Sequence, residues 1–156
     1  MITVGSLTRA QSDPGLREAG IWIELIVPGS AEPLKLRIRS VSSNKARIWD
    51  LARYRKQRAY YVGDNLPPIE VIDQNETDKL AEALVVEWNV SQDDGTELPC
   101  TVENVRAVMA QLPDTRRDAM AEAAKHESYR LQQVEGLAGN SAGPSMPISG
   151  TGAVAA

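Results

Sequence analysis

The chain has 156 residues, 24% of them charged, and a formal net charge of −4, which suits one modest domain and excludes two full hydrophobic cores. Its only cysteine is Cys100 and its only histidine is His126. These two residues exclude an intramolecular disulfide and a zinc site built from the usual ligands, so we expect no metal and no other cofactor.

The charges are segregated along the chain. Residues 35–61 hold nine basic side chains and one acidic one, and residues 64–105 hold eleven acidic side chains and one basic one. The two halves either pair with each other in the fold or offer a charged face to a partner. The sequence shows no secretion signal and no apolar run approaching about 18 residues, which predicts a protein of the cytoplasm.

The first elements in chain order are a flexible segment and a hairpin. Residues 1–20 mix scattered apolar residues with turn formers and predict a flexible N-terminal segment. Residues 21–41 predict a β-hairpin, in which Leu34, Leu36 and Ile38 alternate with Lys35, Arg37 and Arg39. One face should be buried and the other basic. Because a lone hairpin is marginal in water, it must pack on helices or on another chain.

Helical patterns follow the hairpin over residues 44–61, 76–90, 102–112 and 116–135. Ser43 or Asn44 can cap the first of these helices, Asn75 the second and Thr101 the third. The fold class expected is α+β, with an N-terminal hairpin packed on about four helices in one domain, 21–135. Residues 136–156 are rich in Gly, Ser and Ala without charge and predict a disordered tail.

The acidic turn Asp93-Asp94-Gly95 lies close to Cys100 and raises the question of chemistry. The calcium-loop pattern fails, because Val90 stands where that loop needs a carboxylate or amide and Thr101 where it needs a glutamate. A Gly-containing connector is the better interpretation. Cys100 precedes the cap Thr101, where it can pack as a hydrophobic staple, and no base is placed to activate it. We therefore expect no catalytic residue and no enzyme.

A group of basic residues is a further candidate for binding. The basic face that the sequence offers to partners comprises Lys35, Arg37, Arg39, Arg53, Arg55 and Arg58. Aromatic residues are interleaved with bases over residues 45–58, which would suit nucleic acid, but the pI of about 5.1 makes that partner unlikely. A solvated helix balanced by the acidic half is the preferred interpretation.

The run "KLAEALVVEWNVSQDDGTELPCTVENVRAVMAQLPDTRRDAMAEAAKHESYRL" and the "GNS" that follows resemble the tail assembly chaperones of long non-contractile-tailed bacteriophages. Shared features are a helix ending near a Trp, a DDG-x-x-LP turn, a Thr-capped helix and a Leu-Pro stop. The basic segment upstream extends the resemblance to about residues 34–141.

The resemblance implies a non-enzymatic protein of the host cytoplasm during phage assembly. Such a protein holds the long tape measure protein soluble and helps to bring tail tube subunits to it, with homo-oligomers possible and no membrane involved. The residues that would form its groove are Leu84, Val85, Trp88, Val105, Val108 and Met109, unless they are simply core. The alternatives are a structural virion protein, of the tail or of head-tail completion, and a nucleic-acid-binding accessory protein that uses the basic helix 45–58.

Overall fold

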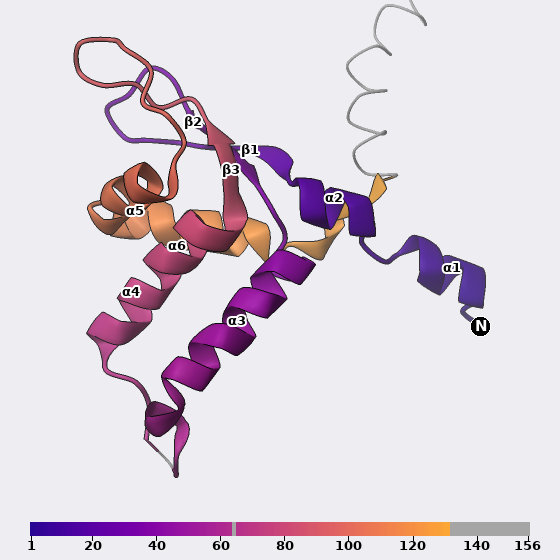
Figure 1. Ribbon diagram of the computed structural model, residues 1–156. Helices are drawn as coiled ribbons and strands as arrows, with labels where there is room; N and C mark the ends of the chain where they lie inside the picture. The colour runs from indigo at the N-terminus through magenta and orange to yellow at the C-terminus, as the bar shows by residue number, and fades with distance from the viewer. Residues whose placement is uncertain (64, 132–156) are drawn as a thin grey trace, which may run out of the picture.

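The computed structural model describes residues 1–63 and 65–131 and has an α+β fold, as the sequence predicts. A three-stranded antiparallel sheet lies against helices, and two helices project from it as an arm (Figure 1). The tail predicted for residues 136–156, and the end of the last predicted helix, lie outside the described residues.

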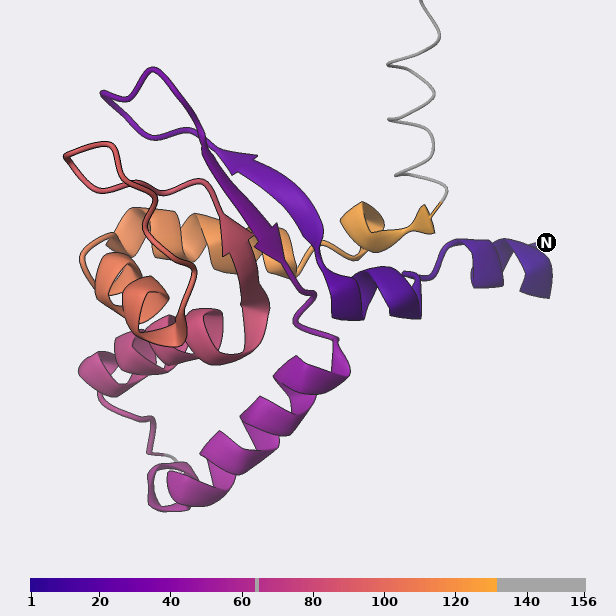
Figure 2. The ribbon, with the colours of Figure 1, turned by 45° about the horizontal axis from the view of Figure 1, so that its top comes forward.

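Two short helices occupy the N-terminal segment. Helix α1 (Val4–Arg9) has no buried residue and lies farthest from the sheet, and α2 (Pro14–Ala19) joins it to the body (Figure 2). Each begins at a capping side chain, Thr3 or Asp13, which accepts a hydrogen bond from a backbone N–H of the first turn.

Gly20 ends α2 and turns the chain into the sheet. Its φ of 84° lies in the left-handed region, and a Cβ there would lie 3.0 Å from the carbonyl carbon and oxygen of Ile38. Both the backbone conformation and the close approach of β2 therefore require glycine at this position.

The predicted hairpin is confirmed as strands β1 (Ile21–Leu25) and β2 (Leu34–Ile38), in the register Ile23 with Leu36. The alternation along β2 is also confirmed, because Leu36 and Ile38 are completely buried. On the opposite face Lys35 pairs with Glu24 at 3.7 Å and Arg37 pairs with a carboxylate of the third strand. Cross-strand acids thus neutralise the basic face predicted for the hairpin.

The helix predicted for residues 76–90 is wrong in its second half. Helix α4 runs over Ile69–Lys79, a π-helical turn η2 follows over Leu80–Leu84, and the chain then becomes strand β3 (Val85–Trp88). β3 pairs antiparallel with β2 and makes the sheet order β1-β2-β3. The free edge of β2 supplies the physical reason, since a third strand satisfies backbone groups that a helix would leave open.

The other predicted helices are present with altered ends. The 44–61 segment forms α3 (Asn44–Lys56) and a short 3₁₀ turn, η1 (Arg58–Tyr61). Helix α5 spans Val102–Ala110, and the last predicted helix becomes α6 (Pro113–Ala123) followed by the 3₁₀ turn η3 (His126–Tyr129). The caps Ser43 and Thr101 are confirmed, because each accepts a hydrogen bond from the N–H three residues on.

The core lies between the inner face of the sheet and the helices η2, α5 and α6. Its completely buried large apolar side chains are Leu36, Ile38, Leu80, Leu84 and Met109. The small residues Ala119 and Ala123, also completely buried, let α6 approach this core closely. Within the described residues no helix is long and apolar enough to span a membrane.

Candidate functional site

The predicted groove residues prove to be core residues. Leu84, Val85, Trp88, Val105 and Met109 are each exposed by no more than 8%, and Val108 is half-buried against the same core. Trp88 is also fixed by a hydrogen bond of 2.7 Å from its Nε1 to the carbonyl oxygen of Leu98. In this structure these side chains do not line an open groove, because the sheet and α6 already cover them.

The Asp-Asp-Gly turn is confirmed as a connector. Gly95 takes a φ of 85°, and the backbone N–H of Gln92 donates to the carbonyl of Thr96 at 2.8 Å. Hydrogen bonds from the side chain and backbone N–H of Thr96 lower the pKa of Asp94. Partial burial, with a smaller effect of Glu87, raises the pKa of the Cys100 thiol and disfavours the nucleophilic thiolate.

Exposed apolar side chains gather instead on the arm, which we define as residues 44–79, comprising α3, η1 and α4. The arm holds half of the exposed large apolar side chains of the described residues: Ile48, Leu51, Tyr54, Tyr60, Tyr61, Val62, Leu66, Ile69 and Ile72. Ile48 is 67% exposed and Leu51 60% exposed, although both sit in a regular helix. Such a concentration marks an interaction surface more often than chance exposure.

Helix α3 turns a largely polar face towards the body of the protein. Along that face Ala46 is buried, and Trp49, Arg53 and Gln57 follow at helical spacing. Gln57 and Asn75 of α4 exchange two side-chain hydrogen bonds of 2.9 and 2.7 Å. Trp49 donates its Nε1 to Glu82 and lies under the guanidinium of Arg53, 4.7 Å from the ring centroid.

An ion-pair network joins α3 to the rest of the fold. Asp78, only 7% exposed, contacts Arg53 of α3 at 3.1 Å and Arg106 of α5 at 2.9 Å. Glu82 contacts the same two arginines at 3.7 and 2.7 Å. The hydrogen bond to Asp78 is the main reason that the pKa of Arg106 is raised. The predicted pairing of the two oppositely charged halves is therefore present between α3 and the acids that follow it.

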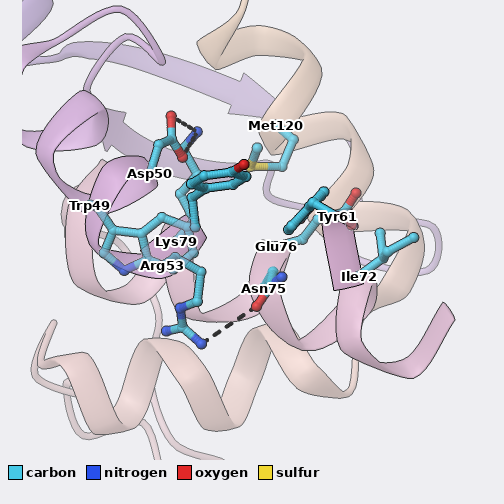
Figure 3. A pocket seen from close by; sticks show the side chains of 10 residues that line it. Trp49, Asp50, Arg53, Tyr61, Ile72, Asn75, Glu76, Lys79 and Met120 are labelled. Atoms are coloured by element: carbon cyan, nitrogen blue, oxygen red, sulfur yellow. Dashed lines mark hydrogen bonds and ion pairs between the residues drawn. The ribbon is translucent and has the colours of Figure 1, made fainter. Parts of the chain in front are cut away.

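The α3–α4 cleft is a cavity of about 360 Å³ between the two helices of the arm. Its apolar lining consists of Trp49, Tyr54, Tyr61, Ile72 and Met120, the last contributed by α6 (Figure 3). Tyr54 and Tyr61 face each other with ring centroids 5.1 Å apart and an interplanar angle of 41°.

The polar side chains of the α3–α4 cleft already have partners within the chain. Asp50 pairs with Lys79 at 2.8 Å, and Glu76 pairs with Arg116 at 3.3 Å. Arg53 and Asn75 belong to the contacts under α3 described above. The groups left to meet a ligand in this cleft are therefore mainly apolar.

Of the predicted basic face, Arg55 and Arg58 are exposed without an ion pair to another described residue, Lys35 is exposed but pairs with Glu24, and the other arginines have partners within the fold. Arg39 donates its Nε to the carbonyl of Glu18 at 2.8 Å, and Arg53 lies in the network under α3. The exposed bases of α3 and η1 are Lys45, Arg47, Arg55, Lys56 and Arg58, and none forms an ion pair with another described residue.

The α3–α4 cleft was not predicted, because the helices predicted over residues 44–61 and 76–90 leave Ile69 and Ile72 outside both. The pair Pro67-Pro68 stands at the start of α4, where Pro68 is the N-cap. Glu70 in the first turn was the available signal for a helix beginning there. Among the described residues, no group of three or more possible ligands is placed to hold a metal ion.

The comparisons with known proteins show a phage-derived protein. A family model described as the YdaY prophage protein matches residues 37–140, which is more than half of the chain. The chain belongs to the YdaY prophage protein family. Phage origin, implied by the resemblance of the sequence, is thereby confirmed, and the family description names no role in tail assembly. No curated protein and no solved structure matches the chain.

Proposed function

We propose that this prophage protein is a tail assembly chaperone that binds the tape measure protein, keeps it soluble and helps to recruit tail tube subunits. It would act in the host cytoplasm by binding alone, with no bond made or broken. The observation that supports this role best is the apolar surface of the arm, whose side chains are exposed and lie outside the core of the domain.

The chemistry of the arm suits a long amphipathic client. A tape measure protein presents apolar helical stripes that aggregate before the tail tube forms around them, and a helix can lay such a stripe on an apolar surface. The exposed bases of α3 and η1 lie on the same two elements as part of this apolar surface and favour clients whose polar face is acidic.

Co-expression tests the proposal directly. The tape measure protein of the same prophage is produced with and without this chain, and its soluble fraction is measured after sedimentation. We expect most of the client to be soluble only when the chain is present. Equal solubility in both cultures would refute the role. Copies of the chain in purified mature particles would identify a structural virion protein instead.

A second candidate function is nucleic-acid binding, and the exposed bases of α3 and η1 favour it. Phosphate contacts by these side chains would give DNA retention that weakens steeply as salt increases. The charge reversals Arg55→Glu and Arg58→Glu would abolish that retention without touching the ion pairs under α3. Absence of retention at low salt would eliminate this candidate.

A further inference from the structure

The α3–α4 cleft is shaped for an apolar side chain. All four of its charged lining groups are paired within the chain, so a polar or charged ligand would find few unsatisfied partners there. The free surface is that of Tyr54, Tyr61, Ile72 and Met120. A volume of about 360 Å³ accommodates one large apolar side chain with part of the backbone that carries it.

The cleft continues into apolar surface on both helices of the arm. Leu51 lies one helical turn before Tyr54 on α3, and Ile69 lies one turn before Ile72 on α4. Leu51 is 60% exposed and Ile69 63% exposed. A helix that placed one side chain in the cleft would therefore cover these two residues with its neighbouring apolar positions.

Basic side chains flank this apolar surface on α3 and η1. Arg47 lies one helical turn before Leu51 on α3, and Arg58 begins η1 four residues after Tyr54, so along the chain an arginine stands beyond each end of the Leu51–Tyr54 pair. Both arginines are exposed and form no ion pair with another described residue. A partner with acidic side chains on either side of its anchor complements this face, whereas a second arm would meet it with like charge.

We propose that the α3–α4 cleft is an anchor site, which takes one large apolar side chain from an amphipathic helix with acidic residues flanking that side chain. The identification of this helix as a segment of the tape measure protein rests on the proposed function. The site itself is a property of the arm, and it can be tested with a synthetic partner.

Two methionines allow binding in the cleft to be measured by NMR. Met120 lines the cleft, whereas Met109 is completely buried in the core. In the full chain with ¹³C-labelled methionine methyl groups, a helical peptide with one Phe flanked by Glu one turn away on each side is titrated. We expect the Met120 methyl resonance to shift to saturation while that of Met109 stays in place. Replacing the peptide's Phe by Ala should weaken binding at least tenfold, since it removes the anchor.

Variants of the chain locate the anchor. Ile72→Glu should weaken peptide binding at least tenfold, because it puts a charge into the cleft, while Ile26→Glu, just after β1 and away from the arm, should leave binding unchanged. Both residues are solvent-accessible, so neither change should unfold the protein. The double variant Arg47→Glu, Arg58→Glu should weaken binding of a Glu-flanked peptide more than binding of a Gln-flanked one. The double variant Lys45→Glu, Lys56→Glu is the matched control, for which we expect no such difference.

The outcomes separate this inference from the proposed function. If the wild-type chain and the Ile72→Glu variant solubilise the tape measure protein equally well, the proposal of an anchor site is wrong and the chaperone role remains. If the peptide binds as described and the client's solubility is independent of the chain, the role is wrong and the site remains. A Met120 shift that follows protein concentration without peptide would show a second copy in the cleft and overturn the proposal.

Discussion

Tyr129 is the largest completely buried side chain in the described part of the fold, and its position explains why the chain folds back after α6. The Tyr129 hydroxyl donates to the carbonyl oxygen of Ile38 in β2 at 3.0 Å. The backbone carbonyl of Tyr129 accepts a hydrogen bond from the backbone N–H of Asp13 at 2.8 Å. One residue near the end of the described chain thus joins the sheet to the segment before α2. Burial, and to a smaller extent Glu122, raises the pKa of the phenol.

This raised pKa predicts an alkaline loss of stability. Above the usual value of 10.0 an unfolded chain releases the phenolic proton, while the folded chain retains it up to a higher pH. The unfolded state then binds fewer protons, so the free energy of unfolding falls as pH rises through this window. Tyr129→Phe should cost about 1–2 kcal/mol at neutral pH and should abolish this part of the alkaline decline.

Urea unfolding at neutral pH and above pH 10 measures both effects, with the exposed Tyr60→Phe as the control. A Tyr129→Phe protein whose stability declines with pH in parallel with the wild type would contradict the assignment.

At the scale of single elements, local signals were sufficient for the starts of α3 and α5, but not for α4, which begins before the predicted cap Asn75, and not for β3. Ser43 and Thr101 could be predicted as caps because a cap depends on residues within one turn. Ala81, Leu84, Val85 and Trp88 fit helical spacing equally well, and only the free edge of β2, far away in sequence, decides that Val85–Trp88 is a strand. The start of α4 had a local signal in Glu70, but the α3–α4 cleft itself depends on contacts between distant parts of the chain, since its lining comes from α3, η1, α4 and α6.

The attachment of α3 to the body is also an element-scale feature, and it depends on Asp78. Asp78→Ala would leave Arg53 and Arg106 without their shared partner. The side chains of these arginines are 22% and 37% exposed, so water offsets part of the loss, and we expect a cost of about 1–3 kcal/mol.

The matched control is Asp50→Ala, which removes another ion pair between α3 and α4, that with Lys79. Asp50 is 48% exposed, and its loss should cost less than about 1 kcal/mol. Chemical denaturation of both variants measures the difference. Equal costs would show that the network under α3 contributes no more than a surface pair.

For the whole molecule, the N-terminal segment divides into a part that hydrogen-bonds to the body and a part whose hydrogen bonds, among the described residues, stay within residues 3–11. α1 has no buried residue, whereas the segment after it carries the carbonyls of Arg17 and Glu18, which accept hydrogen bonds from Ser40 N–H and Arg39 Nε at 3.2 and 2.8 Å. The predicted flexible segment 1–20 is therefore not uniform in its contacts.

Two truncations test this division. Removal of residues 1–11 should change the free energy of unfolding little, because no buried contact is lost. Removal of residues 1–19 leaves the buried Ser40 N–H without its acceptor and should cost about 1–3 kcal/mol or more. The midpoints of thermal unfolding compare the two proteins, and a large loss on the shorter truncation would contradict the description of α1.

The arm leaves the sheet after β2 and returns to it as β3, the neighbour of β2. The pairing of β2 with β3 therefore holds the two ends of the arm side by side, and this pairing does not depend on the exposed side chains of the helices between them. Strand pairing thus fixes where the arm begins and ends, and substitutions at its exposed positions leave that pairing in place.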